Sequence, residues 1–228
     1  MTPPPHGPAR PPKREWLPAD TALWTTCHIV SDTVQGRVPE HRIDTLFPLP
    51  DGAVALAVGD LWVDSFHAAG DGSYDRASTF VWGTGVFGLA LAAGTLAASA
   101  AGNASRRNQA SADAQHAWRP LFGGALFVTN DGIYIQTMQG LSPWTWGSID
   151  LMQVVGFNVV IMQAQSSSGP ITWRITSEWT ELMFALWALR RHPAHPQLRD
   201  GSWLPANWLP WATAQGYRAH LDRPQLGT

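Results

Sequence analysis

The sequence predicts an α+β fold, in which an antiparallel β-barrel or sandwich is closed by an amphipathic helix near the C-terminus. Short strand-like runs follow one another from residue 125 to residue 175, separated by Gly, Asn, Asp and Ser residues, as in an antiparallel meander. Residues 177–191 then place apolar side chains at helical spacing. An uncharged, Ala- and Gly-rich stretch at residues 77–105 interrupts the series, so we expect a domain that is split by an insertion.

Composition limits the class of protein. The chain has 228 residues, enough for one sizeable domain or two small ones. Only 14% of its residues are charged and 13 are Trp, which suits either a β-rich core or contact with an interfacial surface. A net charge of −2 gives no electrostatic reason to expect nucleic acid. With Cys27 as its single cysteine, the chain has neither an internal disulfide framework nor a cysteine-based zinc site.

The N-terminal third is expected to contain a tail followed by strands. Residues 1–20 are proline-rich and predict a disordered tail. Residues 22–30 are rich in β-branched and aromatic side chains and predict a strand. Further short strands are expected at Arg42–Phe47, Ala53–Val58 and Leu61–His67, with a turn at Gly59-Asp60 between the last two.

The stretch at residues 77–105 is long enough to cross a bilayer, because 29 helical residues span roughly 44 Å and a hydrocarbon core about 30 Å. Its strongly apolar residues are sparse, however, and its small residues recur every four positions, a pattern that lets two helices approach closely. Membrane contact and packing within protein both remain open. The residues proposed for membrane contact or self-association are Phe80, Trp82, Phe87, Ala90, Leu91, Gly94, Ala98 and Gly102, with Arg106 and Arg107 as interfacial charges.

Gly83 to Gly88 fit the dinucleotide-binding pattern G-x-G-x-x-G. That pattern is meaningful between a strand and a helix, with an acidic residue about twenty positions further on. No acidic residue follows before Asp113. We therefore expect no nucleotide and, more generally, no cofactor.

The second half of the chain predicts the rest of the domain. Residues 106–118 are expected to continue as helix and to end at Pro120 and Gly123-Gly124. Asn130-Asp131-Gly132 predicts a hairpin turn with positive φ values. Ser177 is the expected N-cap of the helix that ends at Arg191. Residues 193–228 form a Trp- and Pro-rich arm in which Asn207 caps a short helix. The expected strands are Ala125–Thr129, Ile133–Thr137, Trp144–Ile149, Leu151–Val155, Val159–Ala164 and Ile171–Ile175.

This part of the chain resembles a known family. Gly124 to Asn130, Gly132 to Ile135, and Trp144, Trp146 and Ile149 are similar to the Gly-x-Leu-x-Val-Thr-Asn hairpin and following strand of GRAM and bacterial PH-like domains, over residues 124–191. The resemblance implies a PH-like domain at residues 21–192, split by an insertion at residues 77–118, that docks lipid or protein without catalysis. If strands on both sides share one barrel, the insertion cannot be a single crossing. It is then a re-entrant hairpin bending near Gly94, an in-plane helix or a protein-packed helical pair, and the hairpin is favoured.

The chain shows no recognisable catalytic motif and no metal-ligand pattern. The first hypothesis is a cytoplasmic, membrane-associated PH/GRAM-like binding or scaffold protein that self-associates through its small-residue rows. The second is a soluble oligomeric protein whose insertion packs between subunits, and the third is a small enzyme with an unrecognised site. The expected partners are therefore membrane lipid or protein, together with a second copy of the chain.

Overall fold

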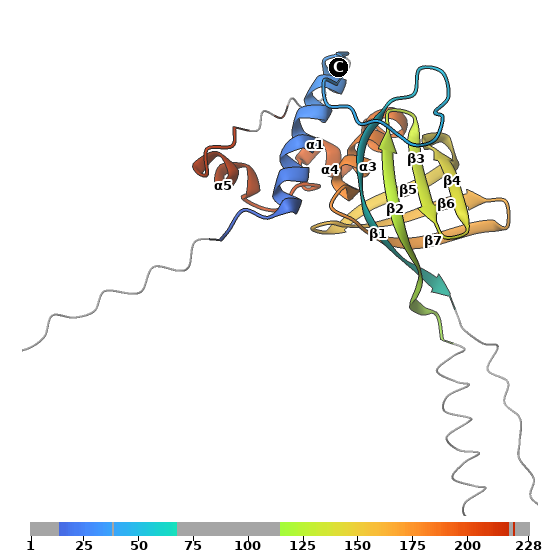
Figure 1. Cartoon of the computed structure of the whole chain (residues 1–228). Helices are drawn as coiled ribbons and strands as arrows, with labels where there is room; N and C mark the ends of the chain where they lie inside the picture. The colour runs from blue at the N-terminus through green and yellow to red at the C-terminus, as the bar shows by residue number, and fades with distance from the viewer. Residues whose placement is uncertain (1–13, 38, 68–114, 219–220, 222–228) are drawn as a thin grey trace, which may run out of the picture.

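The computed structural model describes residues 14–37, 39–67, 115–218 and 221. Within these residues seven strands form one antiparallel sheet in the order β4-β3-β2-β1-β7-β6-β5 (Figure 1). The strands are β1 (Ala55–His67), β2 (Ala117–Thr129), β3 (Gly132–Thr137), β4 (Gly140–Thr145), β5 (Ile149–Gly156), β6 (Val159–Ser166) and β7 (Gly169–Thr176). The helices are α1 (Pro18–Val34), the 3-10 turn η1 (Trp146–Ser148), α3 (Thr180–Arg191), α4 (Pro196–Asp200) and α5 (Trp208–Ala214). The α+β fold class is confirmed.

Strand β1 joins two meanders into one sheet. It pairs with β2 along its whole length, from Ala55 opposite Thr129 to His67 opposite Ala117, and with β7 from Trp62 to Ser65. The strands before and after residues 68–114 therefore belong to the same sheet, and that segment leaves and re-enters at neighbouring strand ends. The predicted membrane or self-association residues between Phe80 and Arg107 lie outside the described residues.

The core lies between the inner face of the sheet and α3. Every residue of α3 from Thr180 to Ala188 is buried, and the Trp187 indole Nε1 donates a hydrogen bond to the Ile149 carbonyl at 3.1 Å. Helix α1 packs against α3, and α5 lies beyond α1 (Figure 1). Burial raises the pKa of the Cys27 thiol on α1 to about 12, so this side chain acts as a small apolar core residue.

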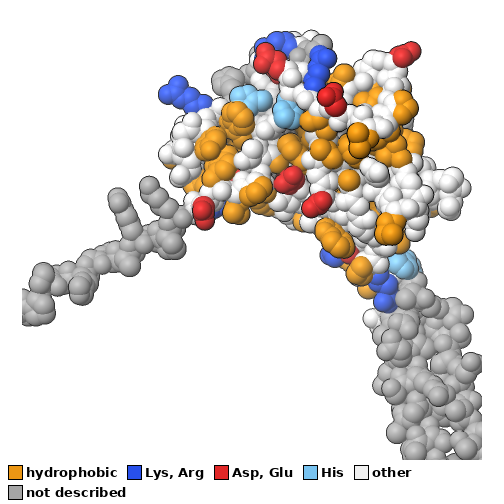
Figure 2. All heavy atoms as spheres, viewed as in Figure 1, with side chains coloured by type: hydrophobic (Ala, Val, Ile, Leu, Met, Phe, Trp, Pro, Cys, Tyr) orange, Lys and Arg blue, Asp and Glu red, His pale blue; other side chains and the backbone are white. Residues whose placement is uncertain are grey.

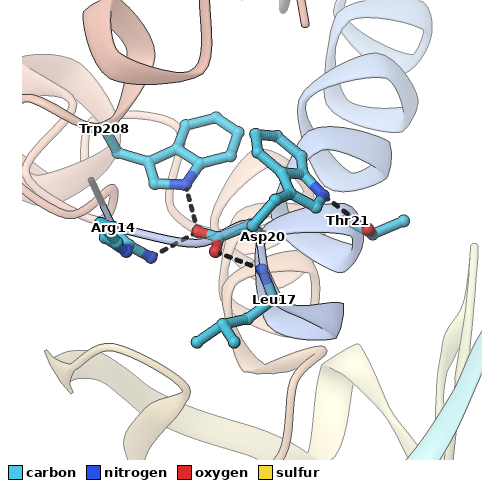
Figure 3. A network of polar contacts seen from close by, with 6 residues as sticks. Arg14, Leu17, Asp20, Thr21 and Trp208 are labelled. Carbon is cyan, nitrogen blue, oxygen red and sulfur yellow. Dashed lines mark hydrogen bonds and ion pairs between the residues drawn. The ribbon is translucent and has the colours of Figure 1, made fainter. Parts of the chain in front are cut away.

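A buried carboxylate on α1 binds both Arg14, which precedes the helix, and Trp208 of the C-terminal arm. Asp20 is fully buried, and its Oδ1 accepts hydrogen bonds from Arg14 Nη2 at 2.5 Å and Trp208 Nε1 at 2.8 Å (Figure 3). Its Oδ2 accepts from the Leu17 backbone N–H at 3.0 Å. Trp16 stacks on Tyr217 with ring centroids 3.7 Å apart. Residues 14–20 are therefore packed against the C-terminal arm rather than forming part of a tail, while residues 1–13 lie outside the described part of the chain.

The strand predicted at residues 22–30 is wrong, because this stretch lies within helix α1. Its side chains have high β propensity, but Leu23, Thr26, Cys27 and Val30 recur at helical spacing and are all buried. Pro18 at the start of the helix and the Asp20 carboxylate bonded to the Leu17 N–H favour helix initiation. Burial on one helical face therefore outweighs the weak intrinsic preference of the individual residues.

The predicted turn at Gly59-Asp60 is also wrong, since β1 runs through both residues. Gly59 is required for close approach: a Cβ there would lie 2.7 Å from the Trp179 ring. The Trp179 indole Nε1 donates to the Val58 carbonyl at 2.9 Å. The strand predicted at Arg42–Phe47 is reduced to an isolated bridge between Ile43 and Ala55.

Replacing Gly59 by alanine is expected to lower the free energy of unfolding by about 2 kcal/mol, because the new methyl group must displace the Trp179 indole. Urea denaturation measures this change. Gly147→Ala is the matched control, since its Cβ would meet its nearest neighbour only at 3.7 Å. Equal midpoints for the two variants would contradict the close approach.

The helix that was expected to end at Pro120 and Gly123-Gly124 is replaced there by strand β2. Ala117 and Trp118 are already in β2, which continues through Pro120 and both glycines. Pro120 pairs with Asp64, next to the register shift between Val63 and Asp64, and such an irregularity is where a sheet tolerates proline. A Cβ on Gly124 would lie 2.2 Å from the Gln136 carbonyl oxygen, so this glycine serves strand pairing rather than a turn.

The predicted β2–β3 hairpin is confirmed, but its turn chemistry differs. Neither Asn130 nor Asp131 has a positive φ. The Thr129 hydroxyl instead accepts from the Asp131 and Gly132 N–H groups at 3.2 and 3.0 Å and donates to the Gly132 carbonyl.

Two predicted boundaries shift, and the cap of α5 is confirmed. The strand expected at Trp144–Ile149 is broken by η1 after Thr145. The C-terminal helix begins at Thr180 with Trp179 as its N-cap, not Ser177. Asn207 is the N-cap of α5, with a φ of 61°.

Candidate functional site

One part of the sheet projects beyond the rest of the domain. We call residues 62–67 of β1 and their partners, residues 117–123 of β2, the stalk. Past Ser65, β1 has no pairing with β7 and is held by β2 alone. Figure 1 shows the stalk extending away from the helices to the points where residues 68–114 begin and end. The stalk therefore positions that segment relative to the domain.

The outer face of the stalk is aromatic and exposed. Trp62 and Phe66 follow the period-two alternation of a strand and are 69% and 44% exposed. Trp118 lies opposite Phe66, with ring centroids 5.2 Å apart. Leu121, at the register shift between β1 and β2, is 47% exposed. Figure 2 shows hydrophobic side chains here together with basic and histidine side chains.

An ion pair crosses this face. Arg174 on β7 binds Asp64 through Nε at 2.9 Å and Nη2 at 2.7 Å. The Arg174 guanidinium carbon also lies 5.2 Å from the centre of the Trp118 ring, within the range of a cation–π contact. Apolar rings and a fixed guanidinium thus lie side by side at the end of the sheet.

A cavity of about 170 Å³ opens on the inner face at the same end. Its aromatic walls are Phe122, Trp144 and Trp173, with Trp173 at 5.1 Å from Trp144 and 5.5 Å from Phe122 between ring centroids. Trp173 pairs with Ser65 of the stalk. The Trp144 Nε1 is buried and finds no hydrogen-bond acceptor among the described residues. None of the residues that line this cavity is charged.

A second cavity, of about 260 Å³, lies between the β5–β6 turn and the C-terminal arm and is lined by Glu181. This side chain is 1% exposed. Its Oε1 accepts from the Asn158 backbone N–H at 2.8 Å, and its Oε2 lies 3.2 Å from the Thr180 hydroxyl. Burial raises the pKa of Glu181 to about 7, although these hydrogen bonds act in the opposite direction.

A third cavity, of about 470 Å³, is lined by Asp150, Trp187, Arg191, His192 and His195 among others. Burial is the largest cause that lowers the pKa of His195, and the nearby His192 lowers it further. The ring of His195 packs 5.0 Å from Phe184. In the part of the chain that the structure describes, no three His, Cys, Asp or Glu residues are grouped closely enough to hold a metal ion.

Sequence reasoning placed its site residues in the insertion, outside the described part of the chain, and missed the stalk. The period-two alternation of Trp62, Asp64 and Phe66 is the sequence signal for the stalk. The turn predicted at Gly59-Asp60 obscures it, because it divides the long strand β1 into two short ones. Trp173 and Arg174 are brought to the stalk only by the pairing of β1 with β7.

Among the described residues, no helix combines the length and apolar character needed to cross a membrane. Comparison of the chain with protein-family models, with curated proteins and with solved structures gave no match.

Proposed function

We propose that this chain is a non-catalytic, PH/GRAM-like protein that associates with a membrane on the cytoplasmic side and acts there as a binding or scaffold module. The observation that carries the proposal is the exposed aromatic face of the stalk, formed by Trp62, Phe66 and Trp118. Indole and phenyl rings are favoured at the boundary between headgroups and hydrocarbon.

The topology supports the same proposal. His67 and Ala117 are paired, so residues 68–114 depart and return beside the aromatic face. A segment that returns to its starting point is compatible with insertion as a hairpin or in the membrane plane, and the sequence at residues 77–105 carries no charge that would oppose contact with lipid. The PH-like character is supported by two antiparallel meanders followed by helix α3.

Replacing both Trp62 and Phe66 by serine is expected to lower the partition of the full chain onto phosphatidylcholine vesicles by about tenfold. Two exposed rings that enter the interface contribute at least about 1.4 kcal/mol between them. Cosedimentation at several lipid concentrations measures the partition coefficient. Both side chains face solvent, so the fold should tolerate the change, and circular dichroism checks this.

Leu46→Ser is the matched control. Leu46 is fully exposed, and its neighbour Phe47 packs on Phe127 and Tyr134, away from the stalk. This variant should bind vesicles like the parent chain. The proposal would be contradicted if the parent chain stays in the supernatant of the vesicle assay and a carbonate wash releases it completely from cell membranes. An oligomer in solution under those conditions would favour a protein interface instead.

A further inference from the structure

The cavity beside the stalk continues the core of the domain. Ile133 and Ile135 are buried core residues, and they pair with Trp144 and Ser142 on β4. Directly opposed residues share one face of an antiparallel pair, so Trp144 and Ser142 point to the inner face. Phe122 is on this face as well, because it pairs with buried Val63. The cavity is therefore the open end of the core.

The Trp144 indole differs from four other indoles of the domain. Trp146, Trp179, Trp187 and Trp208 each donate their Nε1 hydrogen to an oxygen acceptor. The Trp144 Nε1 is buried and has no acceptor among the described residues. The other indole in this condition, Trp24, lies on α1 against His28 and Tyr217. A buried donor without a partner is costly. Trp144 lines the cavity, so we expect an acceptor that enters the cavity and reaches this N–H to be bound favourably.

Size and chemistry restrict the occupant. A volume of about 170 Å³ is below the 300 Å³ or more of ordinary small-molecule pockets, so only part of a larger molecule fits. Phe122, Trp144 and Trp173 suit hydrocarbon, whereas the other side of the lining carries the neutral polar side chains of Thr137, Gln139 and Ser142. Because no cation lines the cavity, the lining does not favour an anionic headgroup. Leu141, which lines the cavity, is 38% exposed, and Met138 in the adjoining β3–β4 turn is fully exposed.

The position of the cavity indicates the source of this group. Gln136 pairs with Ala125, which places the β3–β4 turn beside the base of the stalk, and Trp173 pairs with Ser65 of the stalk itself. A membrane that meets the stalk would bring the layer of lipid ester carbonyls close to this opening. Hydrocarbon joined to an ester carbonyl is also the chemistry that the aromatic walls and the Trp144 N–H can bind together.

We propose that the cavity receives the acyl-ester segment of a membrane glycerolipid, with the ester carbonyl accepting a hydrogen bond from Trp144 Nε1 and the chain lying against Phe122 and Trp173. This inference rests on the proposed membrane association. It adds a specificity to that association, namely a preference for ester-linked over ether-linked lipid.

The test compares two vesicle preparations that share a phosphatidylcholine headgroup and chain length, one with diacyl and one with dialkyl-ether lipid. The full chain is expected to bind diacyl vesicles about threefold to tenfold more tightly, the range that one hydrogen bond supplies. Trp144→Phe keeps the aromatic wall, removes the N–H, and should bind both preparations equally. Trp62→Phe, which removes an exposed indole N–H from the outer face, should keep the preference.

Each outcome separates the two proposals. Equal binding of the parent chain to both vesicle types would overturn the ester site and leave membrane association standing. A preference that survives in Trp144→Phe would also overturn it, since other indoles would then be responsible. A change in oligomer mass caused by Trp144→Phe in lipid-free solution would place a second copy of the chain in the cavity and overturn the lipid assignment. Binding to neither vesicle would refute membrane association, and the ester site with it.

Discussion

Replacing Asp20 by alanine is expected to lower the free energy of unfolding by about 3 kcal/mol. The carboxylate is fully buried and accepts from Arg14, Leu17 N–H and Trp208 Nε1 (Figure 3). Its removal leaves the buried Trp208 indole without an acceptor and deprives the start of α1 of a hydrogen bond. The Arg14 side chain is 45% exposed, so the loss of the ion pair itself contributes little because water replaces it.

Urea denaturation followed by circular dichroism measures this loss, and the same helix provides a matched control. Asp32 on α1 also binds an arginine, Arg37, at 2.5 Å, but both side chains are more exposed. Asp32→Ala should therefore lower the free energy of unfolding by less than about 1 kcal/mol. Equal losses for the two variants would mean that Asp20 acts as an ordinary surface ion pair and does not fasten the C-terminal arm to α1.

Replacing Glu181 by glutamine is expected to remove a pH dependence of stability. The pKa of Glu181 is raised to about 7 from an ordinary value of about 4.5, chiefly by burial. Because the folded state holds the proton more tightly, the associated stability is fully present below pH 4.5 and is lost as the pH rises through 7. The difference of roughly 2.5 pH units corresponds to about 3 kcal/mol between these limits.

The hydrogen bonds around Glu181 explain why the neutral form is accommodated. The single Thr180 hydroxyl hydrogen can be donated either to the Ser177 carbonyl or to Glu181 Oε2, each at 3.2 Å. When Glu181 is protonated, it can donate to the Thr180 oxygen while Thr180 donates to Ser177. Glutamine can make the same arrangement through its amide, and its carbonyl oxygen can still accept from the Asn158 N–H.

Urea denaturation of both proteins between pH 4 and pH 8.5 tests this expectation. Glu181→Gln should become more stable relative to the parent as the pH rises, by about 3 kcal/mol across the range. Glu178→Gln, three residues earlier and only partly buried, should follow the parent profile. A parallel profile for Glu181→Gln and the parent would show that Glu181 remains ionised in the folded protein.

The stalk gives the insertion a defined relation to the domain. Its aromatic outer face and the uncharged cavity on its inner face lie at the same end of the sheet, whereas α3, α1 and α5 lie toward the other side (Figure 1). The two proposed lipid contacts, at the aromatic face and in the cavity, therefore lie at the same end of the domain. Contacts at one end can reach the same membrane surface.

The strands after residue 125 and helix α3 could be predicted from the sequence because their signals are local. Period-two alternation, the Asn130-Asp131 hairpin and the apolar stripe before Arg191 report on faces that are set by nearby residues. The helical spacing of Leu23, Cys27 and Val30 in α1 is a local signal as well, but the β propensity of the same side chains favours a strand. Only the packing of α1 against α3, far along the chain, decides between the two.

The sequence by itself determined a β-rich domain, a closing helix and an uncharged insertion, since composition and periodicity are properties of neighbouring residues. Only the tertiary structure decided that β1 continues through Gly59, because the Trp179 ring that requires this glycine comes from 120 positions away. It likewise brought Trp173 and Arg174 beside Trp118 and Ser65 to complete the stalk and its cavity. The physical reason is that strand pairing and close approach join distant residues, and the sequence around each of them carries no signal of its partner.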